Sequence, residues 1–310
     1  MFRLVSGLFL GWALGSNDAA NIFGTAVATK MVKFKIAAIL TSIFVIIGAV
    51  LEGYKGIETL SSLSTQTLNS AFITSLAAAL TVSIMTYIKL PVSTSQAIVG
   101  SIIGAGIIGN KIDFIPLGKI LISWILTPIG AMIIAFILYK ILGYLVNKIF
   151  KNVILRDRFI KIGLIIAGSY GAYALGANNV ANVTGVFVKS GMITAFQAAL
   201  IGGIGIAIGV VTYSKKVMMT VGKEITKLTP FNALVAVLAE STTVYIYAQI
   251  GVPVSTSQAI VGAVVGIGLI KGLFYVNMKT IKNIVIGWIG TPTIAGIISF
   301  LVTYILYLVN

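Results

Sequence analysis

The sequence predicts an all-α polytopic membrane protein made of two inverted-topology repeats, each with a re-entrant helical hairpin and broken transmembrane helices. The first observation is composition: 58% of the 310 residues are hydrophobic and 9% are charged, whereas a soluble domain has about a quarter of its residues charged. The second is an internal repeat of three sequence blocks. The third is the distribution of lysine and arginine between apolar stretches, which indicates the orientation of the repeats.

The composition also excludes several classes of protein. The mean hydropathy is 1.07, and several apolar stretches reach the roughly 20 residues that span a bilayer. A net charge of +15 does not indicate nucleic-acid binding here, because the 22 lysines and arginines form short clusters beside apolar stretches. The chain has no cysteine and no histidine, so it lacks a thiolate, the commonest metal ligand and the usual general base. We therefore expect no enzyme and no catalytic residue.

Three blocks recur in the same order along the chain. They are GSNDAANIFG (15–24) with GANNVANVTG (176–185), the identical PVSTSQAIVG (91–100 and 253–262), and WILTP (124–128) with WIGTP (288–292). The nearly constant spacing predicts two homologous halves, residues 1–150 and 151–310. Repeats of this kind are typical of transporters, and inverted repeats place the substrate at their interface near the membrane midplane.

Equivalent loops of the two halves differ in charge. The loop after the first helix has Lys30, Lys33 and Lys35 in the first half but only Lys189 in the second. The loop after the second helix has Lys55 in the first half but Lys215, Lys216, Lys223 and Lys227 in the second. Since cytoplasmic loops concentrate lysine and arginine, equivalent loops are expected on opposite sides of the cell (plasma) membrane, with both termini outside. Two full membrane spans in place of each hairpin would put every loop on the same side of the membrane as a hairpin does. The charges therefore do not distinguish hairpins from full spans.

The PVSTSQ blocks predict the hairpins. Proline disrupts the helical turn before it, and the serines and threonine that follow are good caps for a new helix. We expect the first arm of each hairpin to begin near Ser75 and near Val237 and to be about 13 residues long, roughly 20 Å. The break then lies deep in the membrane, where irregular backbone persists only inside protein or along a wet cavity. A proline kink with serine and threonine bonded back to the helix is the structural alternative.

Two such tips, entering from opposite faces, would form an anion site. Each tip offers a helix N-terminus with free N–H groups, a positive dipole end and several hydroxyl groups. These donors suit a tetrahedral oxyanion. The candidate residues are Ser93, Thr94, Ser95 and Gln96 with Ser255, Thr256, Ser257 and Gln258.

The other recurring polar block predicts cation sites. Its oxygen-bearing residues are Asn17, Asp18 and Asn21 in the first half and Asn178, Asn179 and Asn182 in the second. Carboxylate and amide oxygens, together with carbonyl groups freed by glycine-loosened turns, are hard ligands suited to Na⁺. Helix–helix packing through small residues is the alternative, but it does not account for a carboxylate inside the membrane.

These motifs resemble those of the inorganic phosphate transporter (PiT) family, in order and over nearly the whole chain. The resemblance implies an inverted-repeat transporter for inorganic phosphate, sodium coupling, and a homodimer. It implies that Asp18, Asn21, Asn179 and Asn182 hold Na⁺ and that the eight tip residues hold the anion. The sequence departs from the family where Asn179 replaces an aspartate, and where Gln96 and Gln258 stand at positions often taken by histidine.

We therefore expect a sodium-coupled phosphate symporter that works by alternating access, without an organic cofactor. A proton-coupled phosphate permease or a sulfate permease of the same family is the alternative, since sulfate is also tetrahedral. A channel is disfavoured. Glu240, inside an apolar stretch where the first half has Ala78, is either a second coupling site or the partner of a lysine. Lys89 either attracts phosphate or extends toward water.

Overall fold

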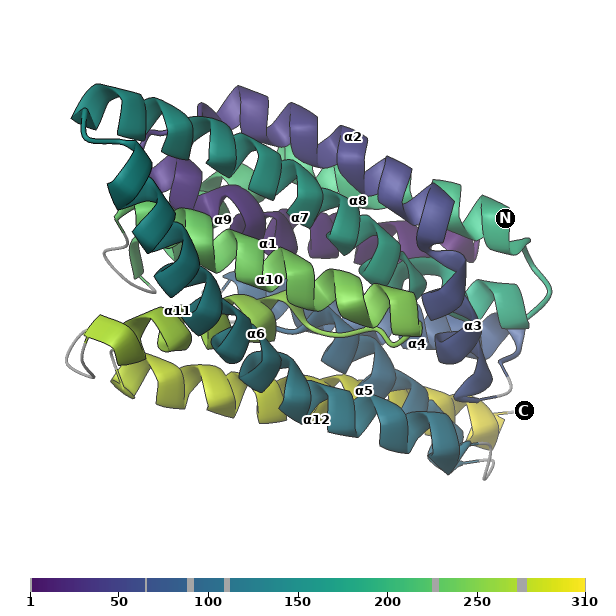
Figure 1. The fold of residues 1–310 in the computed structure, drawn as a ribbon. Coiled ribbons are helices and arrows are strands. Elements are labelled where there is room, and N and C mark those ends of the chain that lie inside the picture. The colour runs from purple at the N-terminus through teal and green to yellow at the C-terminus, as the bar shows by residue number, and fades with distance from the viewer. Residues whose placement is uncertain are drawn as a thin grey trace.

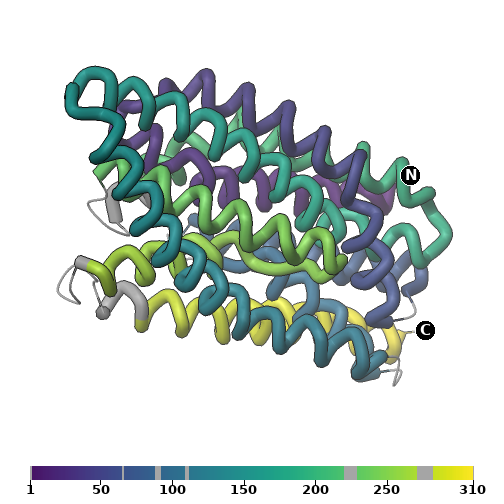
Figure 2. The backbone as a smooth tube through the Cα atoms, viewed as in Figure 1, coloured from purple at the N-terminus to yellow at the C-terminus, as the bar shows by residue number. Residues whose placement is uncertain are grey.

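The computed structural model describes residues 2–64, 66–87, 92–108, 112–224, 229–271 and 278–309, and this part of the chain is almost entirely helical (Figures 1 and 2). Lys89 and Pro91 lie outside the described residues. The helices are α1 (Leu4–Ala28), α2 (Phe34–Glu52), α3 (Tyr54–Ser62), α4 (Leu68–Tyr87), α5 (Thr94–Ile107), α6 (Phe114–Ile149), α7 (Val153–Lys189), α8 (Ala195–Thr212), α9 (Ser214–Glu224), α10 (Pro230–Ile250), α11 (Thr256–Lys271) and α12 (Met278–Val309).

Seven helices of the described chain are long and apolar enough to cross a membrane: α2, α4, α6, α7, α8, α10 and α12. The protein is an integral membrane protein. Both ends of the chain lie at the same end of the helical bundle (Figure 1).

The two hairpins are α4–α5 and α10–α11, and the arms of each pack against one another. Their first arms are longer than the sequence analysis predicted. They begin at Leu68 and Pro230, not near Ser75 and Val237, and contain 20 and 21 residues, which is roughly 30 Å of helix. The reason is a capping threonine: the Thr67 hydroxyl accepts from the Ser70 N–H and the Thr229 hydroxyl from the Asn232 N–H.

The helices that carry the GSNDAAN and GANNVAN motifs are continuous. Helices α1 and α7 run through both motifs without a break, so the expectation of loosened turns at these motifs was wrong. The broken helices occur elsewhere, at the equivalent junctions between α2 and α3 and between α8 and α9. Polar ligands at the motifs must therefore come from side chains and not from freed carbonyl groups.

Close contacts between helices follow the internal repeat. Gly15 of α1 lies against the carbonyl of Ile206 in α8, and the equivalent Gly176 of α7 lies against the carbonyl of Val45 in α2. Helix α5 packs on α12 and helix α11 on α6 in the same reciprocal way. We infer from this pairing that residues 1–150 and 151–310 are two repeats related by a pseudo-two-fold axis, with each hairpin packed on the other repeat.

The contact of Gly262 with α6 predicts a large stability effect. A Cβ at Gly262 would lie 2.1 Å from the Pro128 carbonyl oxygen, whereas a Cβ at Gly118 would meet nothing within 4 Å. Gly262→Ala is therefore expected to lower the free energy of unfolding by about 3 kcal/mol, because helices α11 and α6 must separate. Gly118→Ala should be neutral or stabilising by up to about 1 kcal/mol. Thermal melts of the purified variants in detergent check both, and equal melting temperatures would contradict the packing argument.

Candidate functional site

The two PVSTSQ tips meet inside the protein. The Ser95 hydroxyl donates to the Val254 carbonyl at 2.7 Å, and the Ser257 hydroxyl donates to the Val92 carbonyl at 3.0 Å. These bonds are reciprocal, because each joins the serine of one tip to the valine of the other at equivalent positions. All eight polar tip residues are buried, between 1% and 6% exposed. The predicted tip residues are thus brought together from both halves of the chain.

Each tip begins a helix. The Ser93 side chain accepts from the Gln96 N–H, and the Ser255 side chain accepts from the Gln258 N–H, both at 3.3 Å. The remaining N–H groups of a first helical turn have no partner within the helix, and the dipole places positive charge there. Three buried acceptors at the tips also have no partner: Thr94 Oγ1, Gln96 Oε1 and Gln258 Oε1. The tips can therefore both donate to and accept from a bound oxyanion.

The polar motifs of α1 and α7 lie against these tips. Asn21 donates to the Thr256 hydroxyl at 3.1 Å, and Asn182 donates to the Ser95 hydroxyl at 2.8 Å. Each asparagine therefore contacts the tip of the other half. Asp18 is also hydrogen-bonded to Thr256, and its Oδ1 atom is buried without a partner.

The second half differs from the first at the position of Asp18. Asn179 accepts from Asn182 at 2.8 Å and from Ser95 at 3.1 Å, so a neutral amide replaces the carboxylate within a hydrogen-bonded cluster. The Asn182 Oδ1 atom is buried and free of partners. The predicted cation ligands therefore lie beside the predicted anion ligands in both halves, but only the first half supplies a negative charge.

Asn178 holds the loop around Pro253. Its Nδ2 donates to the Val252 carbonyl at 2.9 Å, and its Oδ1 accepts from the Val254 N–H at 2.8 Å. Both polar atoms of the side chain are thus engaged with backbone, which makes Asn178 a positioning residue for the second tip. The equivalent Asn17 donates to the Thr86 hydroxyl at 3.0 Å, in the last turn of α4.

A polar network that the sequence analysis missed anchors α10, the first arm of the second hairpin. The Glu52 carboxylate accepts from the Tyr173 hydroxyl at 2.6 Å, from Tyr245 at 3.3 Å and from the Gln249 amide, and Lys55 donates to Gln249 at 2.7 Å. It joins the α2–α3 corner to α7 and to the last turns of α10. The spacing of residues along the sequence does not indicate this network, because its members come from distant parts of the chain.

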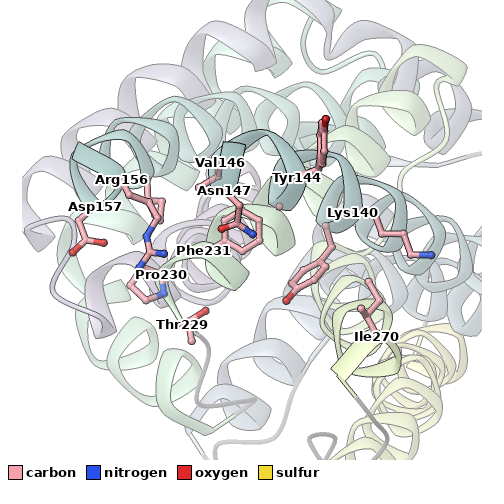
Figure 3. A pocket seen from close by; sticks show the side chains of 13 residues that line it. Lys140, Tyr144, Val146, Asn147, Arg156, Asp157, Thr229, Pro230, Phe231 and Ile270 are labelled. Carbon is pink, nitrogen blue, oxygen red and sulfur yellow. The ribbon is translucent and has the colours of Figure 1, made fainter. Parts of the chain in front are cut away.

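A separate hollow of about 500 Å³ lies at the other end of α10 (Figure 3). Arg156 and Asp157 at the start of α7 and Thr229 and Phe231 at the start of α10 lie around it. Since α10 has 21 residues, this hollow is roughly 30 Å from the second tip. It is therefore distinct from the site formed by the tips.

Comparison with known proteins finds related transporters. A model of the phosphate transporter family matches the chain twice, over residues 14–157 and 151–299. A candidate phosphate permease of Methanocaldococcus jannaschii is 37% identical over 300 residues, which cover 97% of this chain and 95% of that protein. A sulfate permease of Bacillus subtilis is 28% identical over 305 residues, which cover 96% of this chain and 85% of that protein.

A solved structure has the same fold. The structure of a sodium-dependent phosphate transporter matches with a TM-score of 0.90 and 25% sequence identity, and the match covers 100% of both chains. The helices that form the tips and the polar motifs therefore belong to an architecture found in a transporter.

Proposed function

Because this chain belongs to the phosphate transporter family, we propose that it is a sodium-coupled symporter of inorganic phosphate that works by alternating access. The observation that carries this proposal is the reciprocal contact of the two tips through Ser95 and Ser257. It gathers two helix N-termini and eight buried polar side chains in one place, where an anion with acceptors on every side can be bound. The residues are Ser93, Thr94, Ser95, Gln96, Ser255, Thr256, Ser257 and Gln258.

The unpartnered amide oxygens favour phosphate over sulfate. Gln96 Oε1 and Gln258 Oε1 are buried acceptors without partners, and a divalent hydrogen phosphate can donate its single O–H group to one of them. Fully ionised sulfate has no such group, so it would leave both oxygens unpaired. A site that hydrogen-bonds a substrate hydroxyl discriminates strongly against an analogue that lacks it.

Sodium ions at the adjacent motifs balance the phosphate charge. The proposed ligands are Asp18 and Asn21 in α1 and Asn179 and Asn182 in α7. The first two are hydrogen-bonded to Thr256 and the other two to Ser95. A buried divalent anion is costly without compensation, so each ligand favours the binding of the other. Asn178 is not assigned a sodium role here, because both its polar atoms hold the Pro253 loop.

Alternating access follows from the pseudo-two-fold arrangement. Each half contributes one tip and one polar motif, so the site can open toward one side by separating one hairpin and toward the other side by separating the other. The bonds from Ser95 to Val254 and from Ser257 to Val92 are the contacts that separation would break. We also propose that the protein lies in the cell membrane as a homodimer with both termini outside. Tags attached to the termini and probed on intact cells test the orientation. The mass of the purified complex tests the homodimer.

Transport by the purified protein tests the function. In liposomes, labelled phosphate is expected to accumulate under an inward Na⁺ gradient and not in choline, and sulfate at 100-fold excess should inhibit by less than about half. Empty liposomes are the control. Equal uptake in choline under an inward proton gradient would overturn sodium coupling and favour the proton-coupled alternative. Complete inhibition by sulfate at equal concentration would favour a sulfate permease.

A further inference from the structure

Glu240 is a buried carboxylate that the phosphate site does not use. It lies near the middle of α10 and is 0% exposed. The Ser241 hydroxyl donates to its Oε2 atom at 3.3 Å, and Oε1 has no partner. A Cβ placed on Gly171 of α7 would lie 3.6 Å from Glu240 Oε2 and 3.2 Å from Ile22 Cγ2. The carboxylate is therefore held between α10, α7 and the part of α1 that follows Asp18.

The facing side of α1 presents further oxygen ligands. Asp18, Ile22 and Thr25 are spaced four and three residues apart, so they share one face of the helix. Asp18 Oδ1 and Thr25 Oγ1 are both buried and have no partner. Among the described residues, the charge that acts on Glu240 is the like charge of Asp18, and no lysine or arginine offsets it. The lysine partner considered in the sequence analysis is thus not found there.

The second half of the protein has no equivalent set of oxygens. Asn179 stands at the position of Asp18, Ala78 at that of Glu240 and Val186 at that of Thr25. Among the residues whose burial the structure describes, two buried carboxylates therefore lie on the α1–α10 side and none on the other. Two like charges in a membrane interior are strongly unfavourable unless cations accompany them.

We propose that Glu240, with the Thr25 hydroxyl, forms a second Na⁺ position, separate from the one at Asp18 and closer to the C-terminus of α1. The proposal rests on the proposed cation coupling of this transporter. Glu240 adds a second buried acid beside Asp18, whereas the equivalent residues Ala78 and Asn179 add none, so both proposed positions lie on one side of the pseudo-two-fold axis.

Sodium binding without phosphate tests this position apart from transport. Protein in nanodiscs is titrated with radiolabelled NaCl at constant ionic strength, and the number of Na⁺ ions bound per protein at saturation and the rise in melting temperature are measured. The neutral amides of Asn179 and Asn182 are expected to hold Na⁺ only beside bound phosphate, so without phosphate we expect about two Na⁺ bound per wild-type protein and about one per Glu240→Gln protein. Glu58→Gln, which changes an exposed glutamate in α3, is the matched control and should be unchanged.

Thr25→Val keeps both carboxylates and removes only the proposed hydroxyl ligand, so it tests the same position if Glu240→Gln is poorly folded, and it should weaken binding of the second Na⁺ at least about 10-fold. Asn179→Asp provides a further comparison. Asn179→Asp in the wild-type background adds a third carboxylate and should raise the sodium stoichiometry by one. In the Glu240→Gln background it should restore the number of bound Na⁺ ions to about two per protein. Binding of about one Na⁺ per wild-type protein, or Glu240→Gln and Asn179→Asp titrations that match the wild type, would overturn the inference while phosphate uptake still tests the proposed function.

Discussion

Asp18→Asn is expected to lower phosphate uptake at limiting sodium about 100-fold, equivalent to about 2.8 kcal/mol. The asparagine has nearly the same shape, and it can still hydrogen-bond to Thr256, the partner of Asp18. What it loses is the negative charge of a carboxylate that is 3% exposed and has one oxygen without a partner. Since that charge is proposed to hold Na⁺ beside the phosphate, the sodium concentration for half-maximal uptake should rise together with the loss of uptake.

Initial rates of uptake into liposomes over a range of Na⁺ concentrations measure this effect. Asp113→Asn is the matched control, because Asp113 is an exposed cap of α6 whose side chain accepts from the Ile115 N–H at 2.9 Å, and asparagine caps a helix equally well. A uniform fall in uptake at every sodium concentration, with the half-maximal concentration unchanged, would show that Asp18 supports the structure without binding the ion.

The contact between the tips follows from residue identities that are visible in the sequence. Two identical PVSTSQ blocks in inverted halves predict that equivalent atoms meet across a two-fold axis, and Ser95 and Ser257 do so. The arms begin earlier than the expected starts near Ser75 and Val237, because capping residues precede them. Thr67 and Thr229 carried the capping signal, and Pro230 at the first helical position supported it.

The glycines of the polar motifs show why helix continuity could not be predicted. The sequence analysis predicts that glycines loosen the turns of these motifs, but Gly15 and Gly176 instead allow close packing on the carbonyl groups of Ile206 and Val45. The sequence alone does not distinguish a glycine that loosens a helix from a glycine that allows another helix to pack closely. The position of the neighbouring helix decides which role the glycine has. The Glu52 network was missed for a related reason, because its tyrosines lie on two other helices.

The departures from two-fold symmetry are concentrated around α10. The Glu52 network fixes its last turns, and Glu240 lies buried in its middle. The equivalent arm α4 has Ala78 in place of Glu240. The proposed anion ligands are thus alike in the two halves while the charged groups are not, so we expect the asymmetry to lie in cation binding and in the anchoring of the second hairpin.

Ser95→Ala is expected to raise the phosphate KM about 100-fold, and Ser257→Ala about 10-fold. Ser95 interacts with the Val254 carbonyl, Asn179 and Asn182, whereas Ser257 interacts with the Val92 carbonyl and Ser255. A hydrogen bond from a hydroxyl group to a charged ligand contributes about 1.5–3 kcal/mol to the free energy of binding. The loss of either hydroxyl is therefore expected to weaken phosphate binding. Only the loss at Ser95 also releases the amides proposed to hold sodium.

The difference between the two serines separates substrate binding from cation coupling. Ser95→Ala should raise the half-maximal sodium concentration as well as the KM, while Ser257→Ala should change the KM with little effect on sodium. Ser101→Ala is the matched control, because its buried hydroxyl on α5 bonds back to the Ala97 carbonyl at 2.9 Å and lies beyond the first turn of the helix. Equal effects of Ser95→Ala and Ser257→Ala on both quantities would mean that the tips act with full two-fold symmetry, and that Asn179 and Asn182 do not couple sodium to phosphate through Ser95.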